Sequence, residues 1–182
     1  MVLCTGLVLL TAATSATMAK AGPGSYVIDG GTRFERRQVT RALAASTFDW
    51  TLVPTKVTIH VQRTALGADA APGEIWVDPR LLRAGEFSWG IVQHEYAHQI
   101  DFFLLDDSIR ARLLQILGGT AWCYGEAGLP HGAYGCERFA STLAWAYWPS
   151  RENCMRPAEV GSETSSMRPA RFRRLLGSLL SR

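Results

Sequence analysis

The sequence predicts an α+β domain, with short strands in its first half and helices in its second half. Between residues 25 and 78, short runs alternate apolar and polar side chains, as half-buried strands do. From residue 89 onward, apolar side chains recur every three or four positions, which is typical of amphipathic helices. A length of 182 residues and a hydrophobic content of 47% suit one domain with its own core.

The first expected elements are a short strand and a helix. Residues 25–28 form the strand, which ends before a pair of glycines. Thr32 stands where a helix N-cap is expected and Glu35 follows three residues later, so the pair predicts a capping box. An apolar stripe then predicts a helix over residues 33–45.

Two further strands are expected before the helical half. Residues 50–54 predict a turn, and residues 56–61 alternate in the manner of a half-buried strand. Residues 67–73 are expected to form a loop. Residues 74–78 predict a third strand, which Pro79 stops.

Four helices follow, at residues 89–105, 106–117, 137–148 and 171–180. Ser88 is placed to cap the first of them, and Gly118 with Gly119 ends the second. Pro149 ends the third. Residues 120–135 are rich in glycine and aromatic residues and are expected to form a long loop, which inside a compact domain is often functional.

The most informative pattern is His-Glu-Tyr-Ala-His at residues 94–98, inside the first of these helices. His94 and His98 then lie one turn apart on one helix face, with Cβ atoms roughly 5–6 Å apart. Two imidazoles held in this way can reach one Zn²⁺. Glu95 can take a proton from a zinc-activated water. The alternative is a pair of hydrogen-bonded core histidines with a surface glutamate between them.

A catalytic zinc usually takes three protein ligands, so a third group must come from another segment. Asp101 follows His98 by only three positions on the same helix, and we expect it to support a ligand or simply to be exposed. The remaining candidates are Glu126, His131, Glu137 and Glu152. Glu137 is favoured because it begins a helix that can pack against the motif helix. The alternative role for Glu137 is an acid stabilised by the helix dipole.

The segment Glu137-Arg138-Phe139-Ala140 resembles the third-ligand helix of gluzincin metallopeptidases, where Phe-Ala often follows the ligand glutamate. Over residues 56–149 the chain resembles a small zincin of this type. The resemblance implies a small mixed β-sheet packed on the HExxH helix, followed by a mainly helical C-terminal part. It also implies that residues 74–78 are the edge strand that binds extended substrate. Thermolysin-like members have an acid four residues after the third ligand, where this chain has Ser141.

The motif and the resemblance together imply a zinc metallopeptidase that binds Zn²⁺ through His94, His98 and Glu137. Glu95 is expected to act as general base towards the zinc-activated water and then to pass the proton to the leaving amine. The expected partner is a peptide or protein substrate, held as an added strand at the sheet edge.

The developing oxyanion needs a hydrogen-bond donor besides the metal. His131 and Tyr134 are candidate catalytic residues for this role, and Tyr124 is a further candidate from the same loop. Two other functions stay open: a non-catalytic zinc-binding or peptide-binding module on a zincin fold, and a zinc hydrolase acting on a non-peptide amide such as cell-wall material. The intact Glu95 argues against the first, since binding alone does not need it.

Residues 1–21 are expected to be a secretory signal peptide, which leaves residues 22–182 as a single zincin-like metallopeptidase domain. An apolar run at residues 2–10 is followed by small residues and by Ala19-Lys20-Ala21, a cleavage-site pattern. No Lys or Arg precedes the run, so a weak N-terminal anchor is the alternative, although the run is about half of the ~20 residues that span a membrane. We expect a secreted bacterial protein with no stable membrane insertion after cleavage.

Charge and cysteine content bear on two further properties, nucleic-acid binding and disulfide formation. The net charge is +3 and the arginines are mostly scattered, which does not favour a nucleic-acid-binding surface. Cys123, Cys136 and Cys154 allow one disulfide with one thiol left over, and the pairing is open. Three reduced, buried cysteines are the alternative.

Overall fold

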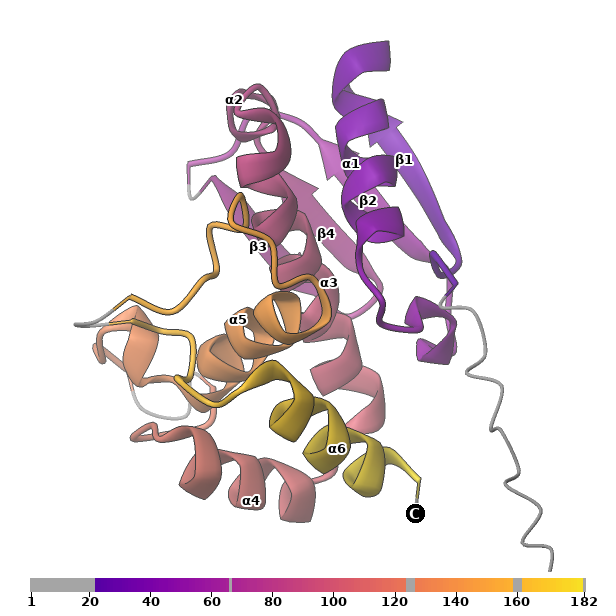
Figure 1. Cartoon of the computed structure of the whole chain (residues 1–182). Coiled ribbons are helices and arrows are strands. Elements are labelled where there is room, and N and C mark those ends of the chain that lie inside the picture. The colour runs from indigo at the N-terminus through magenta and orange to yellow at the C-terminus, as the bar shows by residue number, and fades with distance from the viewer. Residues whose placement is uncertain (1–21, 66, 124–126, 159–161, 182) are drawn as a thin grey trace, which may run out of the picture.

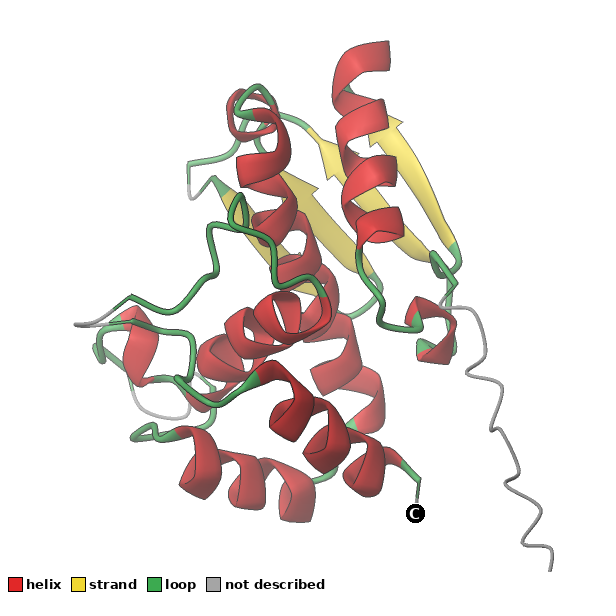
Figure 2. Cartoon of the chain, viewed as in Figure 1, coloured by secondary structure: helices red, strands yellow, loops and turns green. Residues whose placement is uncertain are grey.

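The computed structural model describes residues 22–65, 67–123, 127–158 and 162–181. Within these residues the chain has a mixed α+β structure, so the expected α+β class is confirmed. A four-stranded sheet has helices α1 (Arg33–Ala45) and α3 (Trp89–Leu104) in front of it, and further helices gather around the lower part of α3 (Figures 1 and 2).

The sheet is mixed and has the strand order β1-β2-β4-β3. Its strands are β1 (Tyr26–Gly30), β2 (Val57–Val61), β3 (Ala68–Ala71) and β4 (Glu74–Val77). β1, β2 and β4 run parallel to one another, and β3 runs antiparallel to β4. The alternation expected for the second strand is confirmed, because Val57, Ile59 and Val61 are buried while the residues between them are partly exposed.

The prediction that residues 74–78 form the edge strand was wrong. Residues 74–78 hold β4, which lies inside the sheet between β2 and β3. The edge strand beyond β4 is β3, within residues 67–73, where the sequence predicts a loop. Alanine and aspartate have little strand propensity, so the strand depends on its pairing with β4. That pairing follows from the tight turn at Pro72 and Gly73, whose φ of 81° suits the turn position that favours glycine.

Helix α1 begins as expected, with a capping box. The Thr32 side chain accepts a hydrogen bond from the Glu35 amide, and Glu35 Oε2 accepts one of 2.7 Å from the Thr32 amide. The helix buries Val39 and Leu43 in the core. A 3₁₀ turn, η1 (Trp50–Leu52), follows and fills part of the predicted turn at residues 50–54.

Helix α3 is the central element, and it follows the short helix α2 (Pro79–Leu82) and the 3₁₀ turn η2 (Gly85–Ser88). Its start agrees with the prediction, but Ser88 does not cap it with its side chain. Ser88 has helical backbone angles because η2 runs directly into α3, and its hydroxyl donates to the Gly85 carbonyl at 2.7 Å instead.

The remaining helices form the C-terminal part. They are α4 (Asp107–Leu117), α5 (Gly135–Tyr147) and α6 (Pro169–Leu180), with the 3₁₀ turn η3 (His131–Ala133) before α5. Their boundaries lie within two residues of those predicted. Helix α5 contacts α3, α4 and α6, and its Phe139 ring lies 6.3 Å from the Phe172 ring of α6. The core is therefore continuous from the sheet through α3 to α6.

One disulfide joins Cys123 to Cys136, with their Cα atoms 5.6 Å apart, and Cys154 is free. The prediction of one disulfide and one spare thiol is confirmed. The bond ties the segment that carries His131 to the first turn of α5. The predicted signal peptide at residues 1–21 lies outside the described residues, and within the described part no helix is long and apolar enough to cross a membrane.

The capping box provides a test of the fold. Replacing Thr32 by alanine removes the acceptor for the Glu35 amide, so the free energy of unfolding should fall by about 1 kcal/mol. Thr40→Ala, in the exposed middle of the same helix, is the matched control and should change stability by less than about 0.5 kcal/mol. Urea unfolding followed by circular dichroism measures both. Equal stability of the two variants would contradict the capping role.

Candidate metal centre

His94 and His98 lie on the face of α3 that is turned towards α5, where both contact Glu137. His94 and His98 are 4% and 6% exposed, so neither is a surface histidine. The opposite side of the helix is anchored by Val92 and Tyr96, which are fully buried. The Tyr96 ring packs 5.0 Å from that of Trp50 and so fixes the rotation of the helix. The apolar anchor on one side thus presents both imidazoles on the other.

The structure brings together the three residues predicted as zinc ligands. His94 Nε2 lies 3.0 Å from Glu137 Oε2 and 3.1 Å from His98 Nε2. His98 Nε2 lies 3.3 Å from the same carboxylate oxygen. Ligands bound at about 2.0–2.1 Å around a tetrahedral zinc are roughly 3.3–3.4 Å apart. The three atoms therefore have nearly the spacing of three corners of a tetrahedral site.

The chemistry of these atoms also suits a cation. His94 Nδ1 lies 2.9 Å from Ser141 Oγ, and the hydroxyl hydrogen of Ser141 points to the Glu163 carboxylate. Since that hydroxyl has only one hydrogen, it accepts from Nδ1–H, and a neutral His94 directs its Nε2 lone pair at Glu137. Lone pairs that face a carboxylate oxygen need a positive charge between them, and a divalent metal would supply it.

When no metal is bound, protons on the imidazoles supply the positive charge that faces Glu137. Burial acts to raise the pKa of Glu137, but hydrogen bonds with His94 and His98 hold that pKa well below its usual range. Burial acts to lower the pKa of His98, but the hydrogen bond to Glu137 and the nearby carboxylates outweigh burial and raise it. The cluster is thus a buried carboxylate matched to imidazolium charge, and a metal would compete with these protons.

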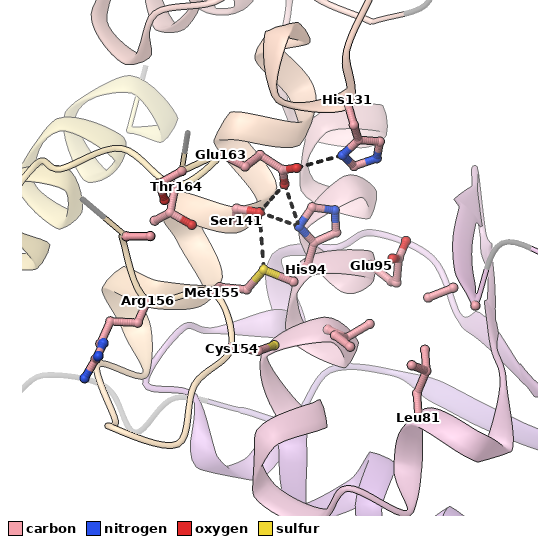
Figure 3. Close-up of a pocket in the computed structure, with 15 residues that line it drawn as sticks. Leu81, His94, Glu95, His131, Ser141, Cys154, Met155, Arg156, Glu163 and Thr164 are labelled. Atoms are coloured by element: carbon pink, nitrogen blue, oxygen red, sulfur yellow. Dashed lines mark hydrogen bonds and ion pairs between the residues drawn. The ribbon is translucent and has the colours of Figure 1, made fainter. Parts of the chain in front are cut away.

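Glu95 lies beside the cluster without taking part in its hydrogen bonds. A carboxylate oxygen of Glu95 is within 4.8 Å of ring nitrogens of both His94 and His98. Figure 3 shows its side chain apart from the network that holds His94. Burial raises the pKa of Glu95, partly offset by the two imidazoles. A carboxylate with a raised pKa next to a candidate metal position is suited to accept and return a proton.

His131, from η3, approaches the cluster from its open side. Its Nε2 lies 3.3 Å from Glu137 Oε2, and its Nδ1 lies 2.7 Å from Glu163 Oε2. The hydrogen bond to Glu163 raises the pKa of His131 to about 9, despite partial burial. Its side chain is 64% exposed, so a charged donor stands at the mouth of the site. This position agrees with the predicted role of an oxyanion donor and also with direct metal ligation.

The other residues predicted for the site lie elsewhere. Tyr134 is 7% exposed at the start of α5 and does not line either cavity next to the cluster, so its predicted role has no support from position. Glu152 is exposed in the segment after α5. Tyr124 and Glu126 lie outside the described residues.

Asp101 has a structural role rather than an exposed position. It is 2% exposed, and its carboxylate accepts hydrogen bonds from Arg110 Nε at 2.8 Å and from Trp122 Nε1 at 3.0 Å. These bonds tie α3 to α4 and to the segment before η3. Asp101 also lies within 4.8 Å of a ring nitrogen of His98, so it adds negative charge behind that imidazole.

Glu163 was missed by sequence reasoning. It lies in a Gly-Ser-Glu-Thr-Ser-Ser segment with no periodicity and no motif, so nothing in the sequence marks it. The signal that did exist was indirect: Ser141 stands where a supporting acid was expected, and the structure places the Glu163 carboxylate directly behind that serine.

Two cavities flank the cluster. The larger, about 510 Å³, has an apolar wall that includes Leu81, Ile91 and Met155. The smaller, about 100 Å³, is bordered by the edge strand β3 at Ala68–Ala70 and by Phe102. His94, Glu95 and His131 line both cavities, so the cluster stands at the junction of a cleft that β3 borders.

Comparison of the chain with protein-family models, with curated proteins and with solved structures finds no match.

The raised pKa of His98 gives a pH test of the site. Ligand imidazoles must be neutral, so protons compete with zinc at every pH below the raised pKa. Zinc affinity should therefore increase with pH from about 6 to about 8, by up to about tenfold per pH unit for each proton displaced. Competition with a chromogenic chelator measures this. An affinity that stays constant over this range would contradict metal binding at His98.

Proposed function

We propose that the protein is a zinc-dependent metallopeptidase of the gluzincin type, with a zincin-like fold. The observation that carries the proposal is the convergence of His94 Nε2, His98 Nε2 and Glu137 Oε2 within 3.3 Å, with the buried Glu95 beside them. The fold agrees with it, because a small mixed sheet lies against the HExxH helix and its edge strand borders the cleft.

His94, His98 and Glu137 would hold the zinc, leaving a position open for water and substrate. When bound, zinc supplies Lewis acidity, which lowers the pKa of a water and polarises a carbonyl. Glu95 accepts the proton from the attacking water and transfers it to the amine that leaves. His131 donates a hydrogen bond from Nε2 to the carbonyl oxygen as negative charge develops there. Glu163 holds the other side of that ring.

The substrate is an extended peptide that pairs with β3. This strand is at the sheet edge and lies next to the cluster, as an added substrate strand requires. It takes the role first expected for residues 74–78, which are interior to the sheet. Secretion after removal of residues 1–21 remains part of the proposal. A non-peptide amide of similar shape stays an alternative substrate, and parallel assays on casein and on cell-wall fragments separate the two.

One observation favours a second function, a non-catalytic zinc-binding module. His131 Nε2 lies 3.3 Å from Glu137 Oε2, as a fourth protein ligand would, and four protein ligands make a closed structural site. The buried Glu95 favours the peptidase, because a closed site has no use for a proton acceptor with a raised pKa.

Replacing Glu95 by glutamine tests the chemistry. The variant should keep zinc but lose hydrolysis by about 10²–10⁴-fold, because glutamine retains the shape and lacks the basic carboxylate. Glu86→Gln, an exposed glutamate of η2 outside the cleft, is the control and should match the wild type. Casein hydrolysis and zinc content are measured on each protein. Wild-type activity in Glu95→Gln would exclude this mechanism.

Replacing His131 by alanine separates the two functions. As a donor to the oxyanion, His131 contributes to rate, so the variant should retain zinc affinity and lose about 10²–10³-fold in kcat. As a fourth ligand it would contribute to affinity, and the variant would bind zinc much more weakly. His60→Ala, on the sheet, is the control for a lost histidine away from the site. A large loss of zinc affinity in His131→Ala alone would move the binding-module function ahead.

A further inference from the structure

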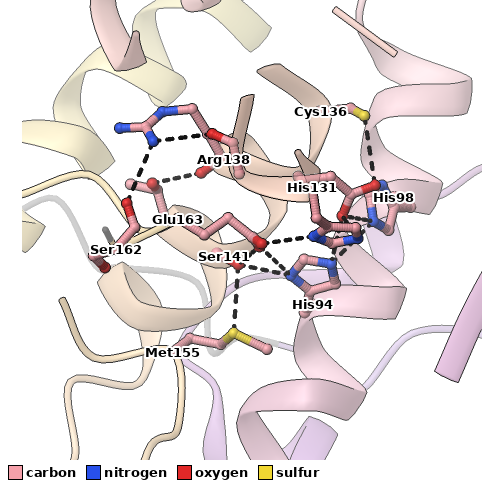
Figure 4. A network of polar contacts seen from close by, with 12 residues as sticks. His94, His98, His131, Cys136, Arg138, Ser141, Met155, Ser162 and Glu163 are labelled. Atoms are coloured by element: carbon pink, nitrogen blue, oxygen red, sulfur yellow. Dashed lines mark hydrogen bonds and ion pairs between the residues drawn. The ribbon is translucent and has the colours of Figure 1, made fainter. Parts of the chain in front are cut away.

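The carboxylate of Glu163 contacts two imidazoles of the site, His131 directly and His94 through the hydroxyl of Ser141 (Figures 3 and 4). We propose that Glu163 is a positioning residue that sets the orientation of both His94, through Ser141, and His131, directly. The inference deepens the proposed function, since these are the rings assigned to metal binding and to the oxyanion.

The two oxygens of Glu163 have separate tasks. Oε2 accepts from His131 Nδ1 at 2.7 Å. Oε1 accepts from the Ser141 hydroxyl, whose oxygen lies 2.9 Å from His94 Nδ1. Oε1 itself is 3.8 Å from His94 Nδ1, so the serine closes the remaining gap. Ser141 Oγ also lies 3.4 Å from Met155 Sδ, a weaker acceptor than the carboxylate.

Both contacts require an acceptor at each oxygen. An ionised carboxylate accepts on both sides, whereas an amide presents one acceptor and one donor. With a glutamine here, the NH₂ group must face either the hydroxyl of Ser141 or the Nδ1–H of His131. If the NH₂ group faces His131, its Nδ1–H loses its acceptor. If the NH₂ group faces Ser141, the hydroxyl loses the carboxylate as its acceptor, and His94 loses the negative charge behind that serine.

The backbone around Glu163 is fixed from both sides. Arg138 Nη1 donates to the Ser162 carbonyl at 3.3 Å and to the Gly132 carbonyl at 3.2 Å, so one guanidinium holds the segments of Glu163 and His131 together (Figure 4). On the other side, the Ser165 amide donates to Thr142 Oγ1 at 3.0 Å. Since Arg138 and Thr142 both belong to α5, Glu163 is positioned by the helix that carries Glu137.

This arrangement gives Ser141 a physical role. The serine hydroxyl reaches His94 but carries no negative charge. Glu163 supplies the negative charge through its hydrogen bond with Ser141, and its other oxygen accepts a hydrogen bond from His131. The orientation of a ligand ring and that of the ring at the cleft mouth are thereby coupled through one side chain.

Histidine ring NMR tests the coupling without metal or substrate. The chain has four histidines, and His60, which bonds Asp29 on the sheet, is an internal reference. Relative to the wild type, Glu163→Gln should shift the ring nitrogen signals of both His94 and His131, and Ser141→Ala should shift those of His94 alone. Glu152→Gln, an exposed glutamate after α5, should shift neither. Unchanged signals of both rings in Glu163→Gln would overturn the proposal.

Zinc affinity gives a second, independent readout. Glu163→Gln and Ser141→Ala should each bind zinc about 10–100-fold more weakly than the wild type, as loss of a group that orients a ligand does. Glu152→Gln should bind zinc as the wild type does. A Glu163 that merely tethers its loop would lower stability and leave both affinity and ring signals intact, which overturns positioning. If the two variants show these ring and affinity changes but the wild type hydrolyses no peptide, the peptidase function is refuted and the positioning role is supported.

Discussion

The contact between α3 and α5 at Glu137 is the constraint on which the rest of the structure depends. His94, His98 and Glu137 are all buried, and ionisable groups in an interior are strongly destabilising unless they are paired. Pairing is possible only where the two helices meet in a register that brings one carboxylate oxygen to both imidazoles. The same register brings three ligand-type atoms within 3.3 Å of one another, so the arrangement that pairs these buried groups is also one that could hold a cation.

The core next to the sheet positions α3, and the C-terminal part positions α5, so both hold the contact between the two helices in place. Residues such as Val92 and Tyr96 anchor α3 in the core, which leaves its other face for polar groups. The sheet edge then falls beside the cluster, where β3 borders the smaller cavity. The disulfide between Cys123 and Cys136 keeps the segment of His131 attached to α5. The cluster therefore lies where a sheet edge, a buried helix and a loop held by a disulfide meet.

Around the cluster, a polar network extends outward from the helices to the segment before α6. Ser141 and Arg138 on α5 connect to Glu163 and to the backbone at Ser162, and His131 joins the same network from the other segment. Buried polar networks that are fully satisfied rigidify the groups they contain. The network therefore holds His131 in one orientation, although its side chain is 64% exposed.

The sequence by itself determined the features encoded over a few residues: the capping box at Thr32 and Glu35, the helical spacing that sets His94 over His98, and the helix that carries Glu137. Hydrogen bonds and helix periodicity act within one or two turns, so a local pattern suffices for them. Tertiary structure alone decided that β3 is the edge strand beside the cluster and that Glu163 lies behind Ser141. Both depend on which distant surfaces are buried together, since an alanine-rich strand and an acid in a loop have no local energetic preference for those places.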